Sequence, residues 1–154
     1  MISDTDMVPI YVMIVLLLIF INAIVVLSNT ALNNVNENKV NQLLNVEKNP
    51  GAKRVIELLE KPFKYKYTNR LLNYIFLIAG ITITIELPYN DALSAVVFLL
   101  VASSFGELFP RKIAIHHSES ISIKLSGLQK FFNALFTPFV FLMTFVTDIF
   151  LRLF

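Results

Sequence analysis

Residues 9–27 read PIYVMIVLLLIFINAIVVL and contain no charged side chain. The apolar run extends from Met7 to Leu27, about 20 residues, which is the length that one helix needs to cross the hydrocarbon core of a bilayer. It ends in the polar string Ser28-Asn29-Thr30. The run therefore predicts a transmembrane helix over residues 7–30.

The composition of the whole chain also indicates a membrane protein. Of its 154 residues, 56% are hydrophobic and 16% are charged, whereas soluble domains have about 45–50% apolar and about 25% charged residues. The absence of Cys excludes a disulfide scaffold, a thiolate nucleophile and a Cys-ligated metal. The first charges, Asp4 and Asp6, are acidic and no small-residue cleavage site follows, so we expect the apolar run to be retained rather than removed as a signal peptide.

Two more crossings are expected over residues 68–87 and 92–112, where apolar runs are separated by the turn Pro88-Tyr89-Asn90-Asp91. Residues 34–62 lie between the first and second crossings, in the stretch 31–70 that is rich in basic residues. Their apolar positions recur at helical spacing on both sides of Asn49-Pro50-Gly51. This pattern predicts two amphipathic surface helices joined by a turn.

The C-terminal region, residues 117–154, is expected to form juxtamembrane helices. Residues 131–154 are apolar and rich in Phe but contain Pro138 and Asp148. They fit either a fourth crossing or a kinked helix lying in the interface. The fold class expected is thus an all-α membrane protein, a single transmembrane domain over residues 1–154, with three transmembrane helices and amphipathic belt helices.

The positions of basic residues predict the orientation of these crossings. Residues 31–70 hold 8 of the 13 Lys and Arg residues, and Arg111-Lys112 follow the third run, so both regions should be cytoplasmic. The turn that carries Asp91 has no basic residue and should lie outside. Three crossings then place the N-terminus outside and the C-terminus in the cytoplasm, in a multi-pass protein of the cell (inner) membrane.

Glu107 lies at the inner end of the third run. A charge at the centre of a membrane helix costs about 2.5–3.5 kcal/mol on insertion scales. Such a carboxylate either binds an ion, relays a proton or pairs with a basic group, here Arg111 or Lys112. Gly106 either permits close helix packing or offers its carbonyl, because Pro110 lacks an N–H and disturbs the helical ladder.

The other two runs carry oxygen-rich positions of their own. Asn73 is either a hydrogen-bonding link between helices or a hard oxygen ligand. Ser28 and Asn29 are either an interfacial polar cluster or further ligands. Three antiparallel helices can bring these positions around one hard cation, and one carboxylate with neutral oxygens and retained waters is the usual style of a Mg²⁺ site.

Other chemistries find less support in the sequence. His116 and His117 are adjacent and point about 100° apart on a helix, so a surface role is favoured over a shared metal. Ser103 and Ser104 are favoured as packing residues, because no general base lies within a suitable motif. We therefore expect neither an enzyme nor a nucleic-acid-binding protein, and a membrane-lytic toxin does not suit a fixed polar cluster.

Four short motifs resemble those of the CNNM/CorC (CorB) magnesium transporter family. The string Leu27–Leu32 resembles the family's S-E-T-A-L signature, and Gly106–Arg111 resembles its G-E-x-x-P-K signature. Thr68 and Asn73 match its T-L-L-I-G-N segment, with Leu72 in place of the glycine. The segment Lys53–Glu60 resembles its A-x-R-V-L-x-L-L segment. The motifs occur in the family's order and spacing over essentially the whole chain.

This resemblance implies a homodimer with three transmembrane helices that exports Mg²⁺, proposed to be coupled to Na⁺ entry. It implies a Mg²⁺ site made of Ser28, Asn73, Glu107 and the carbonyl of Gly106. It also implies a cytoplasmic CBS-pair domain after this region in the full-length protein. Asn29, Ser104, Pro110 and Arg111 are expected around the site or in ion coupling.

Two positions depart from the family pattern. Asn29 stands where the family usually has Glu, which lowers the negative charge near the site. This loss is expected either to weaken Mg²⁺ binding or to change Na⁺ coupling. Arg111 replaces Lys and keeps the charge. A membrane module that senses Mg²⁺ or serves as a scaffold, without transport, is the alternative function.

Overall fold

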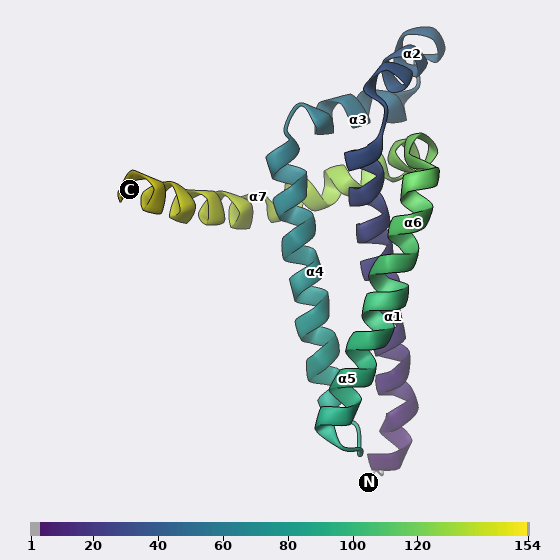
Figure 1. Cartoon of the computed structure of the whole chain (residues 1–154), viewed down its shortest axis with the longest axis vertical. Coiled ribbons are helices and arrows are strands. Elements are labelled where there is room, and N and C mark those ends of the chain that lie inside the picture. Colours follow the sequence, from purple (N-terminus) through teal and green to yellow (C-terminus); the bar gives the residue numbers. More distant parts are fainter. Residues whose placement is uncertain (1–3, 154) are drawn as a thin grey trace.

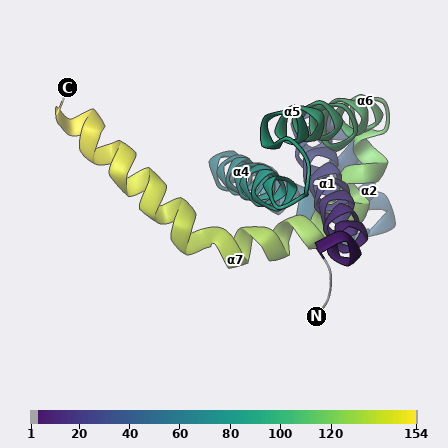
Figure 2. The same ribbon diagram turned by 90° about the horizontal axis from the view of Figure 1, so that it is seen from below.

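Three long helical columns run side by side in the computed structural model, which describes the backbone of residues 4–153 and the side chains of residues 7–150 (Figure 1). The first column is α1 (Asp4–Asn34) and the second is α4 (Pro62–Ile85). The third is a continuous stack of α5 (Asp91–Val101), the π-helix η1 (Ala102–Leu108) and α6 (Phe109–His116). The end-on view of Figure 2 shows the three columns packed together.

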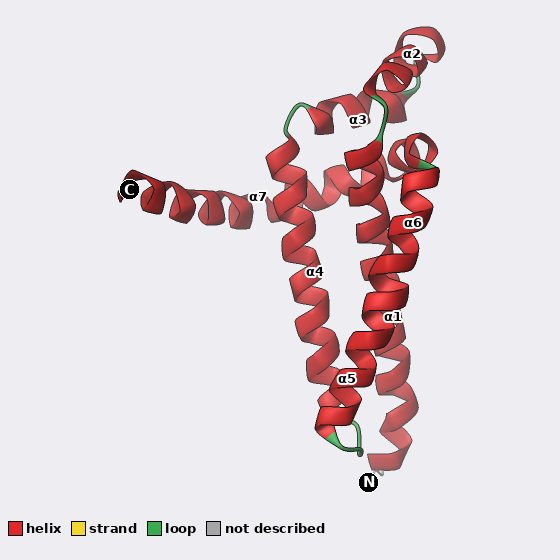
Figure 3. Ribbon diagram, in the orientation of Figure 1, coloured by secondary structure: helices red, strands yellow, loops and turns green. Residues whose placement is uncertain are grey.

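The fourth long helix, α7 (Ser118–Leu153), runs across the columns rather than along them (Figure 1). Its first half passes beside α1 and α4, and its second half extends away from the bundle (Figure 2). Every described element is a helix, which confirms the expected all-α class (Figure 3). By length and apolar composition, four segments are able to cross a membrane: Met7–Asn34, Pro62–Ile85, Asp91–His116 and Ser118–Phe150.

The short helices α2 (Glu37–Glu47) and α3 (Pro50–Leu59) lie at one end of the columns (Figure 1). Each begins at an asparagine cap. The side chain of Asn36 accepts hydrogen bonds from the backbone N–H groups of Asn38 and Lys39, and Asn49 accepts one from Gly51 at 2.8 Å. Such caps satisfy N–H groups that a helix start leaves unpaired.

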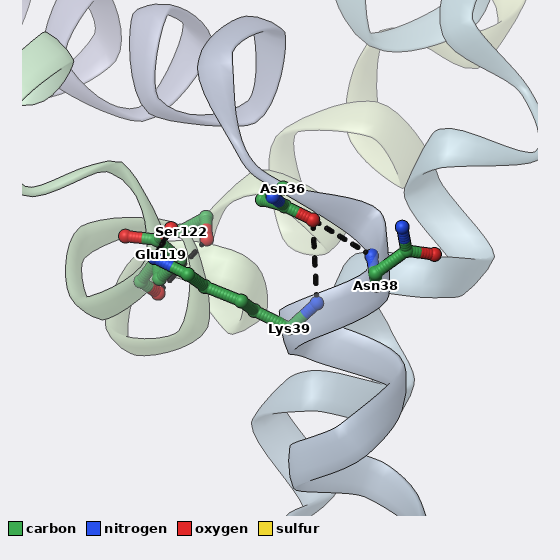
Figure 4. A network of polar contacts seen from close by, with 5 residues as sticks. All are labelled: Asn36, Asn38, Lys39, Glu119 and Ser122. Carbon is green, nitrogen blue, oxygen red and sulfur yellow. Dashed lines mark hydrogen bonds and ion pairs between the residues drawn. The ribbon is translucent and has the colours of Figure 1, made fainter.

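Two ion pairs connect this end to α7. Lys39 of α2 contacts Glu119 at 3.1 Å (Figure 4), and Lys130 of α7 contacts Glu57 of α3 at 2.7 Å. A hydrogen bond from the lysine is the main cause that lowers the pKa of Glu57 and the pKa of Glu119. Both carboxylates therefore stay ionised at neutral pH, although such exposed pairs contribute little to stability.

Apolar packing at the same end joins four helices. Leu32 of α1, Val40 of α2, Val55 of α3 and Tyr65 of α4 belong to one buried cluster. A second cluster lies between α1 and the third column and contains Ile19, Phe98 and Ala102. The columns otherwise expose large apolar side chains, as expected of surfaces that face lipid tails; Met13, Phe20, Ile78 and Leu100 are examples.

The π-helix η1 is placed just before Pro110. Proline has no N–H, so Pro110 cannot donate to the carbonyl of Gly106 four residues earlier. That carbonyl accepts a hydrogen bond from Nδ2 of Asn22 on α1, at 3.4 Å. Single π-helical turns inside helices are frequent at functional sites.

Candidate functional site

A polar cavity of about 380 Å³ opens between α1, α4 and the junction of η1 with α6. It lies toward the end of the columns that carries α2 and α3 (Figure 1). All three columns contribute polar side chains to its wall. Those side chains are Asn29, Thr30, Asn33, Lys66, Asn69, Arg70, Asn73, Tyr74, Glu107 and Arg111.

The wall from α1 carries two asparagines one helical turn apart. Nδ2 of Asn33 donates to the backbone carbonyl of Asn29 at 2.9 Å and to its Oδ1 at 3.2 Å. The hydroxyl of Tyr65 donates to Oδ1 of Asn33 at 3.0 Å. The amide of Asn33 is thus held within the protein, and it orients the side chain of Asn29.

The wall from α4 carries a second pair with the same spacing, Asn69 and Asn73. Asn69 is only 3% exposed, and neither Oδ1 nor Nδ2 has a hydrogen-bond partner among the described residues. Asn73 is half-buried and lines the same cavity. The buried amide of Asn69 thus has no partner among the described side chains, although the residue lines the cavity.

Glu107 supplies the carboxylate of the cavity. Nη2 of Arg111, one turn further along the same column, donates to its Oε1 at 2.5 Å. The side chains of Glu107 and Arg111 remain 37% and 50% exposed. The structure thus shows the ion pair that the sequence allowed, and it also places Glu107 on the cavity wall.

The charge of the lining is positive. Lys66, Arg70 and Arg111 face one carboxylate, an excess of two formal positive charges. Across the described part of the chain, no three His, Asp or Glu side chains are grouped so as to hold a metal ion. A cation in this cavity would therefore depend on Glu107 and on neutral amide oxygens.

Ser28 and Gly106 lie outside this lining. Ser28 is buried, and its hydroxyl donates to Oε1 of Gln129 on α7 at 3.0 Å. Nε2 of Gln129 donates in turn to Oδ1 of Asn133 at 3.1 Å. Of the ligands that the resemblance implies, the structure brings Asn73 and Glu107 to one cavity, and it pairs Ser28 and the Gly106 carbonyl with other groups.

Of the remaining positions named from the sequence, some line the cavity and some do not. Asn29 and Arg111 line the cavity. Ser104 is exposed on η1, and Pro110 is buried in the first turn of α6. Sequence reasoning missed Asn69 and Asn33, although the four-residue spacing of asparagines in both helices was a visible signal.

Together, the fold and this cavity define a multi-pass helical membrane protein with an oxygen-lined polar pocket between its columns. The family model described as the cyclin M transmembrane N-terminal domain matches residues 13–154. The chain therefore belongs to this family, which confirms the resemblance read from its motifs and makes the chain a membrane module related to metal transport. A search of curated proteins found no match.

Proposed function

We propose that this domain binds Mg²⁺ in the polar cavity and exports it across the membrane in exchange for Na⁺. One observation carries the proposal: each of the three columns contributes an oxygen-bearing side chain to the same cavity. These are Asn29 from α1, Asn73 from α4 and Glu107 from η1. The family to which the chain belongs supports metal transport as the activity.

The cavity suits an ion that keeps part of its hydration shell. Mg²⁺ dehydrates reluctantly and is usually bound by one or two carboxylates together with several waters. A volume of about 380 Å³ leaves room for the ion with waters, since each water occupies about 30 Å³ in the liquid. Glu107 supplies the charge, and Asn29 and Asn73 replace some of the water oxygens.

The guanidinium of Arg111 pairs with the carboxylate of Glu107 when no other cation is bound there. A bound Mg²⁺ would displace its guanidinium from Glu107. This exchange costs little, because ion pairs as exposed as this one contribute about 0–1 kcal/mol. The departing Arg111 side chain is half exposed and can reach water.

Ser28 and the Gly106 carbonyl join the ion only in another conformation. Ser28 would have to release Gln129, and Gly106 would have to release Asn22. We place these exchanges in the step that carries the ion from the cavity toward the other side. Alternating access of this kind needs a site whose ligands differ between two states.

The proposed arrangement in the membrane has three crossings. α1, α4 and the third column cross, with the N-terminus outside, and α7 lies in the interface on the cytoplasmic side. The surface helices α2 and α3, with the basic residues Lys48, Lys61 and Lys64 beside them, then rest on the anionic inner leaflet. Family resemblance supports a homodimer and a cytoplasmic CBS pair as further partners.

A module that senses Mg²⁺ or serves as a scaffold without transport is the second candidate. The lining favours it, because three basic side chains face one carboxylate and Asn29 replaces a family Glu. A bound ion without flux in proteoliposomes would distinguish this candidate from a transporter.

Titration calorimetry on the purified domain tests the binding site. Glu107→Gln keeps the shape of the side chain and removes its charge. Glu86→Gln is the matched control, because Glu86 lies at the C-terminal end of α4, outside the cavity lining. Glu107→Gln should weaken Mg²⁺ binding at least about tenfold, equivalent to about 1.4 kcal/mol. Glu86→Gln should bind as the parent does. Equal affinity of the Glu107 variant and the parent would reject the site.

A further inference from the structure

Asn69 is buried in a way that the packing of α4 does not explain. Its side chain is 3% exposed, and both of its polar atoms lack a partner among the side chains that the structure describes, residues 7–150. The great majority of buried side-chain polar atoms in proteins are hydrogen-bonded. Leaving one unsatisfied costs about 1–3 kcal/mol. An apolar side chain at this position would avoid that cost.

Asn69 is placed beside the polar cavity. It lines the same cavity as Asn73, one helical turn away, and as Glu107 on the third column. Across the cavity, the amide of Asn33 is held by Asn29 and Tyr65. On the α1 wall the amide of Asn33 is thus paired within the protein, whereas on the α4 wall the amide of Asn69 is unpaired and closed off from solvent in this structure.

The family motif does not account for this residue. When Thr68 and Asn73 are matched to T-L-L-I-G-N, Asn69 falls on the first leucine. Asn69 thus places an amide where that motif has an apolar residue, in a chain that has Asn at position 29, where the family usually has Glu. Both differences affect the wall of one cavity.

We propose that Asn69 is a further ligand of the cation held in this cavity. The polar atoms of Asn69 are closed off from solvent in this structure, and a side-chain rotation would turn Oδ1 toward the ion and Nδ2 toward a water that the ion retains. The inference rests on the proposed Mg²⁺ site. It assigns to Asn69 a binding role that is opposed to stability, since the amide is satisfied only when the cavity is loaded.

Two measurements on purified residues 1–154 test this role: Mg²⁺ affinity by calorimetry and the melting temperature without Mg²⁺ by circular dichroism. Asn69→Leu should weaken Mg²⁺ binding about tenfold and should raise the melting temperature of the Mg²⁺-free protein. Asn133→Leu is the matched control, a buried asparagine outside the cavity that accepts a hydrogen bond from Gln129. It should lower the melting temperature and leave the affinity unchanged.

A third variant keeps the test valid if Asn69→Leu fails to fold. Asn69→Asp is nearly isosteric and adds a negative charge, so it should tighten Mg²⁺ binding. Unchanged or weaker binding by Asn69→Asp would overturn the inference. So would an Asn69→Leu variant that binds Mg²⁺ like the parent, or one whose melting temperature falls as that of Asn133→Leu does.

The same titration separates this inference from the proposed function. If Glu107→Gln weakens binding and Asn69→Leu does not, the Mg²⁺ site stands and the role of Asn69 is wrong. If neither variant weakens binding, both are wrong. If water is the only partner of Asn69, the first of these results is expected: Glu107→Gln weakens Mg²⁺ binding and Asn69→Leu does not.

Discussion

The hydroxyl of Ser28 on α1 donates a 3.0 Å hydrogen bond to Oε1 of Gln129 on α7, and both side chains are buried. This contact joins the helix that forms one wall of the cavity to the helix that lies across the bundle. Because the hydroxyl has one proton to donate, its orientation depends on where α7 holds Gln129. The position of α7 and the availability of Ser28 are therefore linked.

Gln129→Leu should destabilise the domain by about 1–3 kcal/mol, because it leaves the Ser28 hydroxyl and the Asn133 amide buried without their partner. Melting followed by circular dichroism would measure this loss, since the chain has no Trp for fluorescence. Gln42→Leu, on the exposed surface of α2, is the control and should have little effect. Equal melting temperatures for the two variants would contradict the buried link.

Cysteine labelling tests whether α7 crosses the membrane, and the chain has no Cys of its own to interfere. Tyr89→Cys marks the turn before α5, Asn41→Cys marks α2, and Asp148→Cys marks the far half of α7. An impermeant maleimide should label only Tyr89→Cys in intact cells and the other two after permeabilisation. Labelling of Asp148→Cys in intact cells would show that α7 is a fourth crossing.

Asn29→Glu should tighten Mg²⁺ binding, about tenfold or more, because it adds a carboxylate to a lining with an excess of positive charge. Asn34→Glu adds the same charge on the same helix outside the lining and is the control. Calorimetry on both variants measures the difference. If both bind Mg²⁺ as the parent does, position 29 does not face the ion.

Gly80 of α4 touches the ring of Phe98 on α5, and an added Cβ would lie 2.2 Å from Cζ of that ring. Gly80→Ala should therefore cost about 1–3 kcal/mol of stability, the usual range for overpacking. Phe98→Leu should recover part of this loss in the double variant. Gly127→Ala, whose Cβ would meet its nearest neighbour at 3.9 Å, is the control and should not destabilise. Additive losses from Gly80→Ala and Phe98→Leu would show that the two residues do not interact.

The helical architecture follows closely from local sequence. A charge-free run over residues 9–27 has few alternatives to a buried or membrane-spanning helix, and Asn49-Pro50-Gly51 places a cap and Pro at the start of α3. The direction of α7 could not be predicted from local sequence. Length and apolar composition are the same for a helix that crosses the membrane and for one that lies flat. The direction of α7 relative to the columns is therefore set by its packing against α1 and α4.

The candidate site was only partly visible in the sequence. Glu107 and Asn73 stood out because polar groups inside apolar runs are costly. Asn69 did not, because it is next to Arg70 at the basic end of its helix and resembles a surface residue. The direction of the Ser28 side chain was equally hidden, since its partner Gln129 is 101 residues away.

Mg²⁺ flux in proteoliposomes tests the central claim most directly. Purified chain would be reconstituted with a Mg²⁺-sensitive dye inside, with and without an opposing Na⁺ gradient, alongside Glu107→Gln. The account predicts Mg²⁺ movement by the parent that the Na⁺ gradient accelerates and that Glu107→Gln abolishes. Mg²⁺ binding by the parent without any flux would contradict transport and leave a sensing or scaffold module as the function of this domain.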